Sequence, residues 1–149
     1  MSPDAGKAIA FRVHGQPAPQ GSKSRNRYGA MYESSANQPA WREAVKTAAM
    51  NAARVLRWET VPRGVPVELW VTFWFARPAS HYGTGRNVGV LKPNAPTFKA
   101  SAPDLSKLIR ATEDALTDAG IWHDDAQVVL TVDDKRYGQP GADVRVVIA

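Results

Sequence analysis

Three aspartates flank one helical segment of this chain, and their side chains could together bind a divalent cation. Asp104 precedes the segment, and the adjacent pair Asp124 and Asp125 follows the turn after it. Carboxylate oxygens are the ligands that Mg²⁺ and Mn²⁺ prefer in proteins. The residue types therefore predict metal-dependent chemistry, provided that the fold brings Asp104 and Asp125 to one point.

A purely structural interpretation of the same aspartates stays open beside the metal site. Aspartate is among the best residues for capping a helix N-terminus, so Asp104 could serve only as a cap. The pair Asp124 and Asp125 could likewise form an ordinary turn, since aspartate favours turns. Spacing alone does not decide between these two interpretations.

The helix between the aspartates limits how they can meet. A helix from 104 to 119 is about 24 Å long at about 1.5 Å per residue. Six extended residues after its end reach back only about 20 Å. The chain must therefore turn back along the helix directly after Gly120, or the second carboxylate must come from another copy across a dimer axis.

Hydrophobic periodicity predicts the elements that position these residues. Apolar residues at spacings of three and four predict the helix, with Pro103 at its start and Gly120 at its end. The apolar stripe consists of Leu105, Leu108, Ile109, Thr112, Leu116 and Ala119. The turn after Gly120 is expected to lead into a strand at 128–132.

The rest of the chain predicts a single α/β (α+β) domain, residues 1–149, with a mixed β-sheet and two main helices packed on it. The second helix is expected at 38–56, with an apolar face of Trp41, Val45, Ala48, Ala49, Ala52 and Val55. Further strands are expected at 8–14, 31–32, 65–75 and 143–148, the last pairing with 128–132 as a hairpin. Apolar residues of both parities in 65–75 predict that both faces of this strand are covered, with Trp70 and Trp74 in the core.

The charge is unevenly distributed along the chain and indicates a polyanionic partner. Residues 1–103 hold 14 Lys and Arg against 5 Asp and Glu, whereas residues 104–149 hold 5 against 9. A basic body around an acidic pocket suits a metal-dependent enzyme that acts on nucleic acid. Two irregular segments, 15–29 and 77–102, carry basic residues that are expected to contact phosphates or to clamp DNA: Lys23, Arg25, Arg27 and Arg86.

Composition also excludes several classes of protein. The chain has no cysteine, which excludes disulfides, thiolate metal sites and cysteine nucleophiles. A long apolar run and an N-terminal signal pattern are both absent from the sequence, so we expect no membrane partner and a cytoplasmic location.

The stretch PDLSKLIRATEDALTDAGIWHDDAQV resembles the signature of the RusA-type Holliday junction resolvases. One position departs from the family pattern, because Ser106 stands where the family has a metal-binding Asp. The segments FRVHGQPAPQGSK, WREAV and RPASHYGTGRN resemble the actinobacterial and actinophage branch of the same family. The signature positions that match at unbroken spacing are Asp104, Leu105, Lys107, Leu108, Arg110, Asp114, Ala115, Leu116, Asp124, Asp125, Gln127 and Val128.

This resemblance implies a homodimeric, Mg²⁺-dependent endonuclease that resolves four-way DNA junctions by paired nicks in a bacterial or phage-infected cell. Asp104 and Asp125 would bind the metal, Mg²⁺ or else Mn²⁺, with Asp124 as a supporting or alternative ligand. Arg110 would stabilise the charged transition state, and Lys107 would contact DNA. The Ser106 hydroxyl could hold a metal-bound water, but it adds no negative charge.

Two other functions stay open. The first is a junction-binding protein of the same fold whose catalysis is impaired or lost because of Ser106. If position 106 is not the missing ligand, Glu113 is the first alternative. The second is a plain nucleic-acid-binding module in which the carboxylates are only caps and turns.

Overall fold

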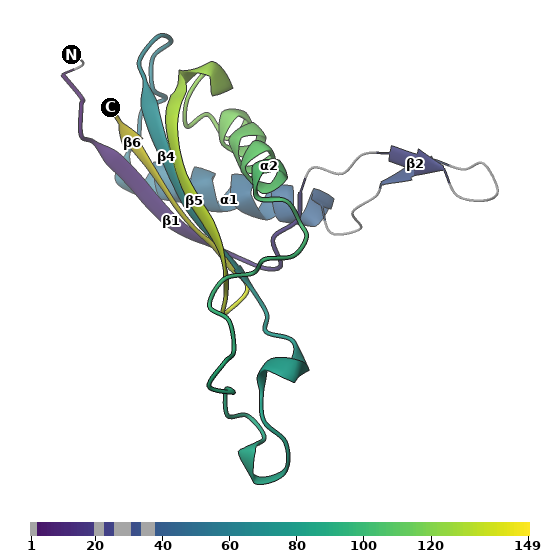
Figure 1. Ribbon diagram of the computed structural model, residues 1–149. Helices are drawn as coiled ribbons and strands as arrows, with labels where there is room; N and C mark the ends of the chain where they lie inside the picture. Colours follow the sequence, from purple (N-terminus) through teal and green to yellow (C-terminus); the bar gives the residue numbers. More distant parts are fainter. Residues whose placement is uncertain (1–2, 20–22, 26–30, 34–37) are drawn as a thin grey trace.

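The computed structural model describes residues 3–19, 23–25, 31–33 and 38–149. Its centre is a mixed four-stranded sheet in the order β1-β6-β4-β5 (Figure 1). β6 is antiparallel to both of its neighbours, and β5 runs parallel to β4 at the edge. The bounds are β1 Ala8–His14, β4 Val67–Phe75, β5 Val128–Tyr137 and β6 Gly141–Ile148.

Two helices, α1 Gln38–Leu56 and α2 Leu105–Asp118, cover one face of this sheet (Figure 1). The sheet residues that face them alternate along each strand, as in the run Val67, Leu69 and Val71 of β4, and all three are buried. They form one core with both helices. The predicted fold class, a mixed sheet with two main helices in a single α+β domain, is therefore confirmed.

The predicted helices agree closely with the observed ones. α1 has the predicted bounds, although Val55 is 75% exposed and does not belong to the apolar face. α2 begins at Leu105 with Asp104 as its N-cap residue. Its buried residues are Leu108, Ile109, Ala111, Thr112, Ala115 and Leu116.

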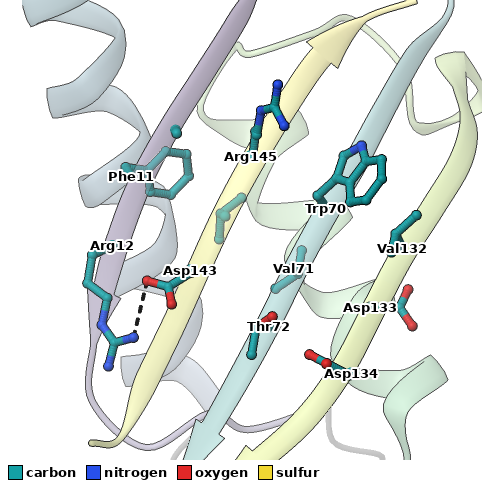
Figure 2. Close-up of a pocket in the computed structure, with 12 residues that line it drawn as sticks. Phe11, Arg12, Trp70, Val71, Thr72, Val132, Asp133, Asp134, Asp143 and Arg145 are labelled. Carbon is teal, nitrogen blue, oxygen red and sulfur yellow. Dashed lines mark hydrogen bonds and ion pairs between the residues drawn. The ribbon is translucent and has the colours of Figure 1, made fainter.

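The prediction that both faces of β4 are covered is wrong. The alternate residues of β4, which point away from the helices, lie on an open face of the sheet. Trp70 on this face is 38% exposed (Figure 2). Trp74 is half-buried, and its indole Nε1 donates a hydrogen bond of 2.8 Å to Asp143 Oδ2. The two helices are enough for one face only, so the aromatic residues of the other face stay partly in contact with solvent.

The predicted hairpin of the last two strands is also wrong. β5 and β6 flank β4 on opposite sides, and β5 continues to Tyr137. Lys135 and Arg136, which lie between the two strands predicted to form the hairpin, belong to this strand. β6 buries Ala142 and its alternate residues, whereas much of β5 is exposed, so the more apolar strand takes the central position.

A second, two-stranded sheet lies in the basic segment after β1. β2 Lys23–Arg25 pairs antiparallel with β3 Met31–Glu33. Lys23 and Arg25 therefore belong to a strand, whereas we had expected an irregular segment. The third predicted phosphate contact of this segment, Arg27, lies outside the described residues.

The connection 77–102 is long and largely irregular, as predicted, and it extends away from the sheet (Figure 1). It contains two short 3₁₀ turns, Ala79–His81 and Gly85–Asn87. Its end returns to the edge of β5, where the Lys99 amide donates to the Lys135 carbonyl at 3.0 Å. Over the described part of the chain, no helix is long and apolar enough to cross a membrane.

The one-sided core predicts unequal costs for two neighbouring substitutions in β4. Leu69→Ala should lower the free energy of unfolding by about 2–5 kcal/mol, because Leu69 is fully buried. Trp70→Ala should cost clearly less, because Trp70 lies on the open face. Urea denaturation of both variants checks this, and equal losses would show that the open face is covered.

Candidate active site

Asp104 immediately precedes α2, but its side chain does not cap the helix. Its backbone is extended, and its carboxylate accepts no hydrogen bond from the first turn. The side chain is 65% exposed, with Lys107 Nζ 3.7 Å from Asp104 Oδ2. The carboxylate is thus accessible to a ligand from outside the chain.

Asp124, by contrast, has a structural role. It caps the 3₁₀ turn Asp125–Gln127, and its Oδ1 accepts a hydrogen bond of 3.0 Å from the Ala126 amide. Gln127 Oε1 accepts in return from the amides of Asp124 and His123. This capping box fixes the turn that carries Asp125.

Gln127 also ties this turn to the rest of the domain. Its side chain is buried, and its Nε2 donates to the carbonyls of Pro62 at 2.9 Å and Val65 at 3.0 Å. Gln127, which matched the family signature, therefore positions the turn that carries Asp125. The sequence pattern alone did not reveal this role.

Asp125 lies beside the C-terminal half of α2. Its Oδ1 accepts a hydrogen bond from Thr117 Oγ1, which in turn accepts from Trp122 Nε1 at 2.7 Å. It also shares a hydrogen bond with Asp114. Asp104 lies at the other end of the helix, about 15–20 Å away at about 1.5 Å per residue.

One chain alone therefore does not bring Asp104 and Asp125 together. Consistent with this, the described residues contain no group of three or more His, Asp or Glu side chains arranged to hold a metal ion. Of the two routes that helix length left open, the chain does turn back after Gly120, but it returns only as far as the neighbourhood of Thr117.

Asp125 instead belongs to a group of acidic side chains, the acidic cluster, made of Glu113, Asp114, Asp125 and Asp133. Burial, together with the charges of Asp125, Asp114 and Asp133, raises the pKa of Glu113 to about 7. The pKa of Asp114 is also raised, first by burial and then by Asp125. Burial raises the pKa of Asp133 as well.

Of this cluster, Asp125 was predicted as a ligand and Glu113 only as an alternative, while Asp133 was not predicted at all. Glu113 and Thr117 are four residues apart and so share one side of α2. Because Thr117 binds Asp125, this spacing could have indicated that Glu113 lies near Asp125. Asp133 approaches only because β5 runs back along the helix, which no local pattern shows.

The remaining predicted residues of α2 lie near its N-terminus. Ser106, Lys107 and Arg110 are all exposed. Arg110, with Arg42 of α1, opposes the rise in the pKa of Asp114. The outer side of α2 is therefore basic in its first half and acidic in its second half.

Of the predicted DNA contacts outside α2, Lys23 and Arg25 lie in β2, and Arg86 is exposed in the 3₁₀ turn Gly85–Asn87. The small β2 sheet and the connection 77–102 project from the body in different directions (Figure 1). These basic residues could therefore contact only separate parts of a large ligand.

A groove lies on the open face of the sheet, and Asp133 is the member of the acidic cluster that lines it. It is lined by Trp70, Asp134, Asp143 and Arg145 among others (Figure 2). Two of the carboxylates that line it have arginine partners, since Arg12 Nη1 lies 3.1 Å from Asp143 Oδ1 and Arg136 Nε donates to Asp134 Oδ2 at 2.8 Å. Asp134 Oδ1 is buried and accepts no hydrogen bond from the residues that the structure describes.

The family whose sequence model matches the chain is described as Endodeoxyribonuclease RusA, and the match spans residues 14–148. A search of curated proteins found no match.

The pKa of Glu113 predicts how stability depends on pH in the absence of metal. Because the pKa rises from 4.5 to about 7 on folding, the folded protein binds this proton more tightly than the unfolded chain does. The free energy of unfolding should therefore fall as the pH rises through this window. Glu113→Gln should make the fall smaller and should be the more stable protein at pH 8.

Urea denaturation in EDTA at several pH values measures this difference. The exposed Glu59→Gln variant is the matched control and should follow the unchanged protein. An identical pH dependence of the Glu113→Gln variant and the unchanged protein would contradict the assigned burial and repulsion.

Proposed function

Because the chain belongs to the RusA family of endodeoxyribonucleases, we propose that it resolves four-way DNA junctions by metal-dependent hydrolysis of two phosphodiester bonds. The family match includes α1, α2 and the strands β4, β5 and β6. The observation that carries the proposal is the placement of Asp104 and Asp125. The Asp104 side chain is exposed and makes no capping hydrogen bond, and Asp125 lies among further carboxylates.

The proposed metal site is shared between two copies of the chain. Asp104 and Asp125 are too far apart within one chain to bind one ion. If a two-fold axis sets two α2 helices antiparallel, Asp104 of one copy lies beside Asp125 of the other. A homodimer of this kind also suits a junction, which is close to two-fold symmetric and needs two cuts.

The carboxylates around Asp125 support a divalent cation as the cofactor. Mutual repulsion contributes to the raised pKa values of Glu113 and Asp114, and a bound cation would relieve it. Oxygen ligands of this kind favour Mg²⁺, with Mn²⁺ as an alternative. When bound, the cation would neutralise charge at phosphorus and help the leaving oxygen depart.

The chain's own residues then have distinct roles. Asp104 and Asp125 hold the cation, and Asp124 holds the turn that positions Asp125. Arg110 places a guanidinium beside this site and stabilises the negative charge of the transition state. Contacts to phosphates position the junction and come from Lys23, Arg25, Arg27, Arg86 and Lys107.

Ser106 gives the second candidate function, a junction-binding protein with slow cleavage. The serine is exposed in the first turn of α2 and supplies no carboxylate where the family signature has one. Glu113 lies seven residues later, about two turns, and so on the same side of the helix. Its raised pKa supports Glu113 as a partial replacement within the acidic cluster.

Cleavage of a synthetic four-way junction tests the proposed function. Asp104→Asn should abolish cleavage in Mg²⁺ and Mn²⁺ and leave the fold intact, because the Asp104 side chain makes no capping bond. Asp118→Asn, which loses only an ion pair with Arg42, is the control and should still cleave. Gel-shift binding in EDTA should be retained by both variants. Unchanged cleavage by Asp104→Asn would remove Asp104 from the site.

Restoring the family carboxylate should increase activity. Ser106→Asp adds a charged oxygen ligand next to Asp104, so we expect nicking at least about tenfold faster, which corresponds to about 1.4 kcal/mol of barrier. Junction cleavage rates at several Mg²⁺ concentrations measure both the rate and the metal dependence. If Ser106→Asp is no faster, position 106 is not the missing ligand and Glu113→Gln becomes the next variant to test.

A further inference from the structure

The connection 77–102 carries exposed apolar side chains at its tip, which we define as residues 84–91. Val88 is 73% exposed, Val90 56% and Leu91 46%. The connection extends away from the sheet, so these side chains lie apart from the core of the domain (Figure 1). Exposed apolar side chains that gather in one place mark a surface for binding a partner.

The tip has a defined shape, because backbone hydrogen bonds close it. The Gly83 amide donates to the Val90 carbonyl at 2.9 Å, and the Asn87 amide donates to the Thr84 carbonyl at 3.0 Å. A Cβ atom added at Gly83 would meet Asn87 Cβ at 2.6 Å, so only glycine permits this close approach. The tip therefore presents its valines from a closed turn.

The base of the connection is fastened to the end of β5. The Arg77 guanidinium lies over the Tyr137 ring, 5.4 Å from its centroid, and the Tyr137 amide donates to the Thr97 carbonyl at 3.0 Å. The Arg136 guanidinium lies over the Phe98 ring at 4.9 Å. Such cation–π contacts and the backbone bond hold both ends of the connection to the same strand.

Lys135 of β5 links the connection to Asp104. Its Nζ donates to the carbonyls of Ser101 and Pro103, both at 2.7 Å. Asp104 follows Pro103 directly. The tip and Asp104 are thus mounted on the same end of one strand, so a ligand bound by the tip has a set position relative to Asp104.

Charge identifies the kind of partner that suits the tip. Residues 77–102 contain no Asp or Glu, whereas they contain four basic residues. Two of these, Arg86 and Lys92, are exposed and lie on either side of the apolar residues in the sequence. An apolar surface between two basic side chains complements DNA, in which apolar base faces lie between phosphate backbones.

We infer that the tip is a wedge that inserts between base pairs at the branch point of a four-way junction. Val88 and Val90 contact the base faces, and Arg86 and Lys92 bind the flanking phosphates. Apolar side chains that enter a base stack in this way unstack it and kink the duplex. At a branch point the stack is already interrupted, so insertion costs less free energy there than in a continuous duplex. The inference rests on the proposed function and names the part of the junction that the connection contacts.

Fluorescence of the adenine analogue aminopurine tests the insertion, because stacking quenches this base. The full-length chain in EDTA is bound to a synthetic junction with aminopurine beside the branch point, and the fluorescence should rise. Val88→Ser with Val90→Ser should still bind the junction in a gel shift but lose the rise. Both valines are exposed, so circular dichroism should show an intact fold.

Two control variants accompany this pair. Val55→Ser replaces an equally exposed valine on α1 and should keep the rise. Val88→Leu keeps an apolar side chain at the tip and should also keep it, because leucine serves as a wedge in other DNA-binding proteins.

The basic residues of the tip should behave differently from its valines. Arg86→Ala with Lys92→Ala should weaken binding to junctions and linear duplexes alike and flatten the salt dependence, because phosphates are common to both. The two valine-to-serine substitutions should leave binding to linear duplex unchanged. An equal loss on duplex and junction from the serine pair would show that the tip does not recognise the branch point.

The outcomes separate this inference from the proposed function. A rise that the serine pair retains, or no rise when the unchanged chain binds the junction, overturns the wedge and leaves junction cleavage untouched. A lower mass of the serine pair in light scattering would overturn it too, because a second copy would then cover the tip. A chain that fails to bind junctions overturns both, whereas a rise without cleavage in Mg²⁺ or Mn²⁺ overturns only the proposed function.

Discussion

The rigid length of α2 is the constraint on which the arrangement of the site depends. A helix cannot bend to bring its two ends together, so Asp104 and Asp125 stay about 15–20 Å apart at about 1.5 Å per residue. In the proposed function, each end supplies part of the metal site, and neither end is complete by itself. A site shared between antiparallel copies uses both halves and yields two equivalent centres.

The acidic cluster concentrates negative charge that the fold does not neutralise. The pKa of Glu113 rises to about 7 because burial and neighbouring carboxylates disfavour its charged form. The surrounding bonds nevertheless hold the cluster in place, through the capping box of Asp124 and the buried amide of Gln127. Groups that are held together despite repulsion are suited to binding a cation.

Local patterns predicted the elements, but long-range pairing decided the site. The apolar periodicity of α2 and the helix signals at Asp104 and Gly120 predicted its position, and the structure agrees. The insertion of β6 between β1 and β4 depends on contacts that are distant in sequence, so the predicted hairpin was wrong. For the same reason, Asp133 could not be assigned to the acidic cluster from the sequence. Asp124 was predicted as a supporting ligand, and the structure shows that its Oδ1 also caps a turn, while the ligand role stays a prediction.

Mixing two inactive variants tests the shared site most directly. Asp104→Asn and Asp125→Asn should each abolish junction cleavage alone. If each metal site takes Asp104 from one copy and Asp125 from the other, a mixed dimer holds one site with both aspartates, and the mixture should regain measurable nicking. If both aspartates act within one chain, every site in the mixture lacks one of them. A mixture as inactive as its components, with subunit exchange verified, would contradict the shared site.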